Sequence, residues 1–67
     1  GVISPGEYEF GTSKKETMTV ISGVLTVLLP GMEEWMTYGS GEFFEVAGQA
    51  SFKARTDIDT AYLCTYE

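Results

Sequence analysis

The side chains that could do chemistry in this chain are mostly carboxylates, because it has ten acidic residues, one cysteine and no histidine. Without histidine, a zinc or other transition-metal site lacks its commonest ligand. Cys64 has no histidine to activate it as a nucleophile, so we expect it to be a buried apolar side chain. A calcium or magnesium site made of oxygen ligands remains open.

The charge balance excludes two classes of partner. Ten acidic residues outweigh four basic ones, which gives a formal net charge of −6. Nucleic-acid backbones and anionic membranes repel such a chain, and four cations are too few for a phosphate-binding stripe. Apolar runs such as Val27-Leu28-Leu29 are far shorter than the roughly 20 residues of a membrane span. No stretch resembles a signal peptide, so we expect a soluble cytoplasmic protein.

The length predicts that the domain needs support. A chain of 67 residues makes at most one small domain, which hides only about 60% of the surface of its unfolded form. One cysteine cannot form an intrachain disulfide, and the missing histidines argue against a structural zinc. We therefore expect support from a second subunit, or from residues that belong before Gly1.

The composition predicts an all-β domain. β-Branched and aromatic residues are frequent, and glycines and prolines divide the chain into runs of strand length. No longer window has a helical apolar stripe. Ser22-Gly23 looks like a tight hairpin turn, and the regular spacing favours a sandwich or barrel. The predicted strands are Glu7 to Phe10, Thr17 to Ser22, Val24 to Leu29, Glu34 to Tyr38, Glu42 to Val46, Ser51 to Arg55 and Thr60 to Tyr66.

Alternation assigns the side chains of each strand to two faces. In the strand after Glu16, Met18 and Val20 share one face, while Thr19 and Ile21 share the other. Both faces are therefore partly apolar, whereas an isolated monomer would have one clearly polar face. This pattern predicts that the outer wall packs against a second copy of the chain, forming a homodimer.

Two stretches resemble the motifs of the cupin fold. Glu16 is followed after six residues by Gly23, as at the end of the first cupin motif. A later stretch resembles the second cupin motif: Gly41-Glu42-Phe43-Phe44-Glu45-Val46-Ala47-Gly48, in which Ala47 stands where a proline is usual. Their order and separation fit a cupin barrel.

A wider resemblance covers essentially the whole chain. It is carried by Pro5-Gly6-Glu7-Tyr8, by Met18-Thr19-Val20-Ile21-Ser22-Gly23 and by Tyr62-Leu63-Cys64. These stretches resemble the bacterial pyrimidine/purine nucleoside phosphorylase family, whose members are small single-domain cupins. The resemblance implies an all-β, cupin-type β-barrel (jelly roll) over residues 1–67, without an N-terminal strand that the family has. It also implies phosphorolysis, in which phosphate replaces the base of a nucleoside and gives ribose 1-phosphate and a free purine or pyrimidine.

The resemblance implies roles for individual residues. Glu16 would point into the barrel and act as the catalytic carboxylate, holding ribose hydroxyls or stabilising positive charge on the sugar. Lys14 and Lys15 would bind phosphate at the barrel mouth, assisted by backbone amides of Gly11-Thr12-Ser13. A base would stack on aromatic side chains that line the pocket, because stacking tolerates any base. These are Phe10, Tyr38, Phe52 and Tyr62.

The resemblance also bears on cofactors. The positions where cupins carry metal-binding histidines fall around Thr12 to Lys14 and Ser51-Phe52, and none of these is a histidine. Glu16 alone would hold a metal too weakly, so we expect an enzyme with no metal and no other cofactor than the phosphate co-substrate. Lys53 and Arg55 alternate with Phe52 and Ala54, and we expect this basic pair on the outer surface.

Each of these assignments has a simpler alternative. Glu16 could be an exposed acid at the start of a strand, the lysine loop an ordinary solvated loop, and the aromatic residues core or interface. The chain as a whole could be a non-catalytic cupin that binds a sugar or nucleoside, or a structural dimerisation module.

Overall fold

The computed structural model describes residues 1–66, which form eight strands and no helix. Among these residues there is accordingly no helix long and apolar enough to cross a membrane. The seven predicted strands are confirmed with ends shifted by one or two residues, and β1 was not predicted. The strands are β1 (Val2–Ile3), β2 (Gly6–Thr12), β3 (Glu16–Ser22), β4 (Val24–Leu28), β5 (Met36–Gly39), β6 (Phe43–Val46), β7 (Ala50–Thr56) and β8 (Thr60–Tyr66).

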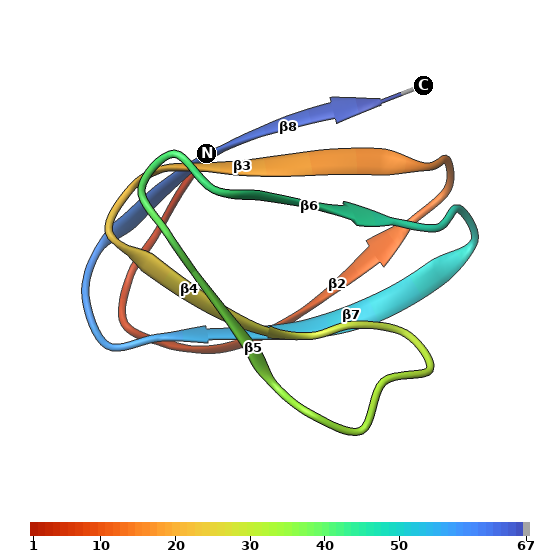
Figure 1. Cartoon of the computed structure of the whole chain (residues 1–67), viewed down its shortest axis with the longest axis horizontal. Helices are drawn as coiled ribbons and strands as arrows, with labels where there is room; N and C mark the ends of the chain where they lie inside the picture. The colour runs from red at the N-terminus through yellow and green to blue at the C-terminus, as the bar shows by residue number, and fades with distance from the viewer. Residues whose placement is uncertain (67) are drawn as a thin grey trace.

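The strands form two four-stranded antiparallel sheets. The order is β1-β8-β3-β6 in the first sheet and β2-β7-β4-β5 in the second. Figure 1 shows the two sheets as facing layers, with β3, β6 and β8 in one layer and β2, β4 and β7 in the other. The chain crosses repeatedly from one layer to the other. This arrangement confirms the prediction of an all-β, cupin-type barrel of jelly-roll form.

The core lies between the two sheets. In β3 the side chains of Met18 and Val20 share one face, as alternation predicted, and that face is buried, whereas Thr19 between them is half-buried. Phe52 and Ala54 point inward from β7, and the basic residues beside them are exposed, as expected. Burying each larger apolar side chain contributes roughly 1.5–3 kcal/mol. The buried apolar residues are Ile3, Met18, Val20, Leu25, Val27, Phe44, Val46, Phe52 and Ala54.

The hairpin predicted at Ser22-Gly23 is wrong, because β3 and β4 belong to different sheets. The register of β3 against β8 shifts between Val20 and Ser22, which is a β-bulge, and Gly23 has a φ of 87°. A side chain at Gly23 would place its Cβ 2.6 Å from Thr60 Oγ1. Gly23 therefore allows a close crossing between the layers, rather than a two-residue hairpin turn.

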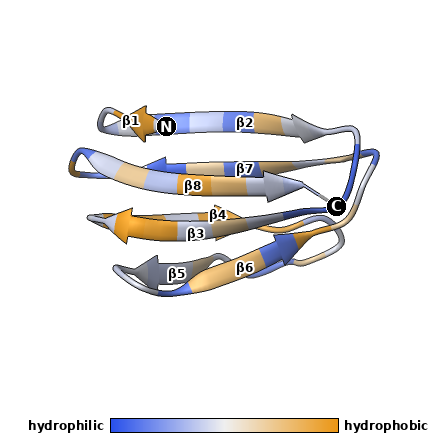
Figure 2. Ribbon diagram, turned by 90° about the horizontal axis from the view of Figure 1, so that it is seen from above, coloured by the Kyte–Doolittle hydropathy of each residue, from blue (hydrophilic) through white to orange (hydrophobic). Residues whose placement is uncertain are grey.

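The outer faces of the two sheets differ in polarity. In Figure 2 orange, hydrophobic segments are seen in β1, β3, β6 and β8, and blue, hydrophilic segments in β2 and β7, although β3 and β6 also have a blue segment near one end. The outer face of the second sheet pairs Glu7 with Arg55 and Glu9 with Lys53 across β2 and β7. That of the first sheet exposes four large apolar side chains, which we call the apolar outer face: Val2, Ile21, Phe43 and Leu63.

Candidate functional site

Glu16 is a buried carboxylate at one end of the barrel. It begins β3, where it is only 4% exposed. Its neighbours in the sheet are Val46 at the end of β6 and Tyr66 at the end of β8. The alternative of an exposed acid at a strand start is therefore wrong. Burying a carboxylate is costly unless it is hydrogen-bonded.

Cys64 supplies a hydrogen bond to this carboxylate. Its Sγ donates to Glu16 Oε2 over 3.2 Å, from the half-buried inner side of β8. The expectation that Cys64 is a buried apolar residue is met only in part, because the side chain packs against the core but is half-buried, and its thiol has a polar partner. Burial and the nearby Glu16 carboxylate raise the pKa of the Cys64 thiol, although a hydrogen bond with Tyr66 works in the opposite direction. The thiol consequently stays protonated at neutral pH and remains a donor.

Tyr66 extends the same group of side chains toward solvent. It follows Cys64 by two positions on β8 and is 64% exposed. Contact with the Cys64 thiol raises the pKa of the Tyr66 phenol. Glu16, Cys64 and Tyr66 therefore form a graded set, from a buried carboxylate to an exposed hydroxyl, at the end of the barrel where β3 begins.

The four predicted aromatic residues lie in one cluster inside the barrel. Phe10 stacks on Phe52 with ring centroids 5.4 Å apart, and its edge contact with Tyr62 spans 6.4 Å. Phe44 joins them to Tyr38, with its centroid 5.9 Å from that of Phe52 and 4.8 Å from that of Tyr38. Phe44 was missed in the sequence, where alternation does not say which of Phe43 and Phe44 faces inward.

This aromatic cluster lies directly beyond Glu16 along the barrel. Met18 is the next inward position of β3 after Glu16, and its register partners are Phe44 on β6 and Cys64 on β8. Phe52 is 2% exposed and belongs to the core. The other three predicted residues are half-buried, so their rings retain exposed surface: Phe10, Tyr38 and Tyr62.

The lysine loop lies at the same end of the barrel as Glu16. Lys14 and Lys15 are exposed, and Lys15 Nζ forms an ion pair with Glu45 Oε2 over 3.3 Å. Glu45 projects outward from β6, so this contact holds the Lys15 ammonium toward the outer side. Such an exposed pair contributes only about 0–1 kcal/mol, which a bound anion can offset.

The loop that carries these lysines, between β2 and β3, contacts the loop between β6 and β7. Thr12 Oγ1 donates to the carbonyl of Ala47 over 2.7 Å and accepts from the amide of Ala50 over 3.1 Å. A Cβ at Gly48 would lie 3.1 Å from the backbone nitrogen of Lys15 and 3.2 Å from Lys14 Cα. The glycine of the second motif therefore permits a close approach that sets the position of the lysine backbone.

Comparison with known proteins agrees with this geometry. The sequence profile of the family described as "Pyrimidine/purine nucleoside phosphorylase" matches residues 1–66. The chain belongs to this family. A protein of that name from Marinobacter nauticus is 80% identical over 66 residues, which are 98% of this chain and 71% of the relative. The resemblance found in the sequence is thus confirmed.

Solved structures support the same fold. A crystal structure of a protein of unknown function from Vibrio parahaemolyticus has a TM-score of 0.95 and 50% identity, covering 98% of this chain and 70% of that one. The EutQ protein of Clostridium difficile has a TM-score of 0.75 at 17% identity, covering 97% of this chain and 47% of the other. The second comparison supports the fold alone.

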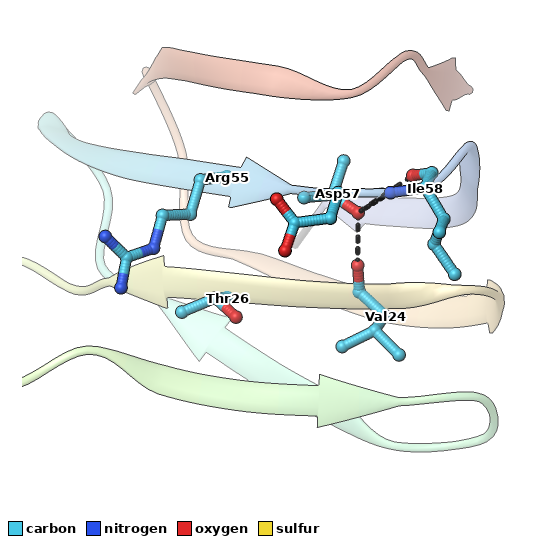
Figure 3. Close-up of a pocket in the computed structure, with 6 residues that line it drawn as sticks. Val24, Thr26, Arg55, Asp57 and Ile58 are labelled. Carbon is cyan, nitrogen blue, oxygen red and sulfur yellow. Dashed lines mark hydrogen bonds between the residues drawn. The ribbon is translucent and has the colours of Figure 1, made fainter.

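A cavity of about 300 Å³ lies away from the Glu16 end of this nucleoside phosphorylase family member. It is lined by residues of β4, of the end of β7 and of the loop that follows (Figure 3). Thr56 Oγ1 donates to the carbonyl of Val24 over 2.7 Å, and Thr60 Oγ1 lies 3.0 Å from the Thr56 hydroxyl. These hydroxyls bond to each other and to backbone carbonyls, and these bonds join the ends of β4, β7 and β8.

The described part of the chain has no carboxylate cluster suited to a metal. Within residues 1–66, no three His, Cys, Asp or Glu side chains lie close enough together to hold an ion. Glu16 has the Cys64 thiol beside it instead of further oxygen ligands. The candidate site in this member of the pyrimidine/purine nucleoside phosphorylase family is therefore a carboxylate, a thiol and an aromatic cluster.

Proposed function

We propose that this chain acts as a nucleoside phosphorylase on both purine and pyrimidine nucleosides. A phosphate oxygen forms a bond to C1′ of the ribose while the bond from C1′ to the base nitrogen breaks. The electron pair of that bond leaves with the base, which takes up the proton that dihydrogen phosphate brings. The products are ribose 1-phosphate and free base, so atoms and charge balance without a cofactor or a resident metal.

The observation that carries this proposal is the buried carboxylate of Glu16 beside an aromatic cluster. As the bond to the base breaks, positive charge develops on the ribose ring. A carboxylate that is 4% exposed interacts with such a charge more strongly than it would in water, because the surrounding dielectric is low. We therefore assign to Glu16 the role of stabilising the sugar in the transition state.

The aromatic residues suit a broad choice of base. Stacking on a ring depends on the π-face that every base has, rather than on the pattern of donors and acceptors at its edge. We assign the stacking surface to the half-buried Phe10, Tyr38 and Tyr62, with Phe52 supporting Phe10 from the core at 5.4 Å. A stacking surface of this kind would accept purines and pyrimidines alike.

Phosphate is assigned to the lysine loop. Lys14 and Lys15 are the two cations next to Glu16 in a chain whose net charge is −6, so an anion is attracted only locally. The close approach of Gly48 to the backbone of this loop, where a Cβ would lie 3.1 Å from the Lys15 nitrogen, favours a constant position for the site. Backbone amides of the same loop add donors.

We also propose that the working form is a homodimer joined through the apolar outer face. Two chains that each have a net charge of −6 repel each other, and burial of apolar surface is an attraction that can offset this repulsion. Val2, Ile21, Phe43 and Leu63 offer such a surface on the first sheet, each more than half exposed. The outer face of the second sheet, with its paired acids and bases, remains in water.

A direct assay tests the reaction. The protein is incubated with uridine or adenosine in buffer containing a chelator, with and without inorganic phosphate, and free base is measured. The proposal predicts base release that requires phosphate and survives the chelator. Binding of nucleoside without release would instead favour the non-catalytic binding cupin, and neither binding nor release would favour a structural module.

A further inference from the structure

We propose that Cys64 is a positioning residue for Glu16, its thiol donating the hydrogen bond that fixes the orientation of the carboxylate inside the barrel. The inference deepens the proposed phosphorylase function and rests on it for its kinetic consequence. The hydrogen bond itself is a separate physical statement, which can be tested without any activity.

The first support is the geometry of the pair. Cys64 Sγ and Glu16 Oε2 are 3.2 Å apart, within the range for a hydrogen bond to sulfur. Glu16 is 4% exposed, and the Cys64 thiol is the side-chain donor that the described residues give it. A buried carboxylate is destabilised when it has no hydrogen-bond donor, because it has lost its contact with water. The orientation that keeps the bond to Cys64 is therefore favoured over others.

The second support is rigidity. The strands that carry the pair, β3 and β8, are adjacent and are in register from Glu16 opposite Tyr66 to Val20 opposite Tyr62. In this ladder Cys64 lies opposite Met18, and Glu16 is two residues before Met18 on β3. The thiol therefore contacts Glu16 diagonally across the two strands. The backbone therefore holds donor and acceptor at a fixed separation.

The third support is the chemistry of the donor. A thiol donates a weak hydrogen bond and has no formal charge. Lysine or arginine at this position would compensate the negative charge of Glu16, whereas a thiol orients the carboxylate and leaves the charge available to the sugar. Burial raises the pKa of Cys64, so the proton needed for donation stays on sulfur at neutral pH.

Infrared spectroscopy tests the hydrogen bond directly. The chain has one cysteine, so its S–H stretching band reports Cys64 alone. The band is expected at the lower frequency of a hydrogen-bonded thiol, and to rise in Glu16→Leu, which removes the acceptor. Glu9→Leu, on the outer face of the second sheet, is the matched control and should leave the band unchanged. A band that is the same in wild type and Glu16→Leu would overturn the proposal.

Kinetics test the consequence for the reaction. Cys64→Ala should lower kcat about tenfold, the loss of one hydrogen bond, with little change in the KM for phosphate. Cys64→Ser keeps a donor and should recover most of that loss, which a merely structural role would not predict. Thr65→Ala, the outward-facing neighbour, should match wild type. Equal kcat for Cys64→Ala and wild type would overturn the proposal. If wild type releases no base, the proposed function fails, while the S–H band still decides whether Cys64 holds Glu16.

Discussion

Cys64 Sγ lies 3.2 Å from Glu16 Oε2 although 48 residues separate the two in the chain. The pairing of β3 with β8 brings them together and places both on the inner side of the first sheet. This contact gives the buried carboxylate of Glu16 a hydrogen-bond donor. It also gives the thiol of Cys64 an acceptor for its proton.

The stability of the fold should fall at alkaline pH because of Cys64. Burial and Glu16 raise its pKa in the folded chain above the ordinary 9.0, whereas the unfolded chain keeps the ordinary value. Above that pH the unfolded chain loses a proton that the folded chain retains, so the free energy of unfolding falls as pH rises. Below it this contribution is fully present.

Urea unfolding at a series of pH values measures this slope. Cys64→Ser removes the titrating thiol and should flatten the decline that begins near pH 9.0. Contact with Cys64 also raises the pKa of Tyr66, but this phenol is exposed and should add little, and only above its ordinary 10.0. A decline of the same size in wild type and Cys64→Ser would rule out the thiol as its source.

Phe44 was not among the aromatic residues predicted from the sequence, yet it should contribute strongly to the stability of the fold. It is 4% exposed and its ring contacts both Tyr38 and Phe52. Truncation to alanine removes these contacts and leaves a cavity, so Phe44→Ala should lower the free energy of unfolding by about 3–5 kcal/mol. Chemical denaturation measures the change. Ile58→Ala, at a side chain that is 50% exposed, is the control and should cost only about 0.5 kcal/mol; similar losses in both variants would contradict the packing described.

Gly48 should control the phosphate site through the backbone of the lysine loop. A Cβ there would lie 3.1–3.2 Å from backbone atoms of Lys14 and Lys15, so Gly48→Ala should displace this loop and raise the KM for phosphate several-fold. Gly11→Ala is the matched control, because a Cβ at Gly11 meets nothing within 4 Å. If the KM for phosphate is unchanged in Gly48→Ala, the lysine loop is not where phosphate binds.

The apolar outer face should be required for dimer formation. Leu63→Glu puts a charge at a side chain that is 54% exposed in the first sheet, and each chain would then bring an unpaired charge into the proposed interface. Sedimentation analysis should show a monomer for this variant and a dimer for wild type. Ser51→Glu, which adds the same charge on the outer side of β7, should remain a dimer; a monomeric wild type, or a dimeric Leu63→Glu, would exclude this face as the interface.

The strands could be predicted from the sequence because they depend on local signals, whereas the inward direction of Glu16 was expected only from the resemblance to the cupin motif. Glycines and prolines mark the ends of strands, and alternation divides each strand into two faces whatever lies beside it. The short strand β1 was not predicted, because its two residues, Val2 and Ile3, are too few to show alternation.

The errors arose where the outcome depends on a partner strand. Ser22-Gly23 has the composition of a hairpin, but β4 pairs with β7 and β5 rather than with β3. The partner of Cys64 is likewise set by the β3–β8 register and not by any nearby residue. The four aromatic residues that were expected to stack on a base lie in one cluster, yet Phe44, which links them, could not be distinguished from Phe43 before the sheet was known.

The most direct test of the central claim is the rate of phosphate-dependent base release by Glu16→Gln. Glutamine keeps the size of the side chain and removes its charge, so the transition state loses its electrostatic partner. We predict base release by wild type and by Glu9→Gln, whose carboxylate is exposed on the second sheet, with a loss of about 10²-fold or more in Glu16→Gln. Thermal unfolding of all three should confirm that each is folded. A folded Glu16→Gln protein that releases base at the wild-type rate would contradict the claim that this buried carboxylate stabilises the sugar.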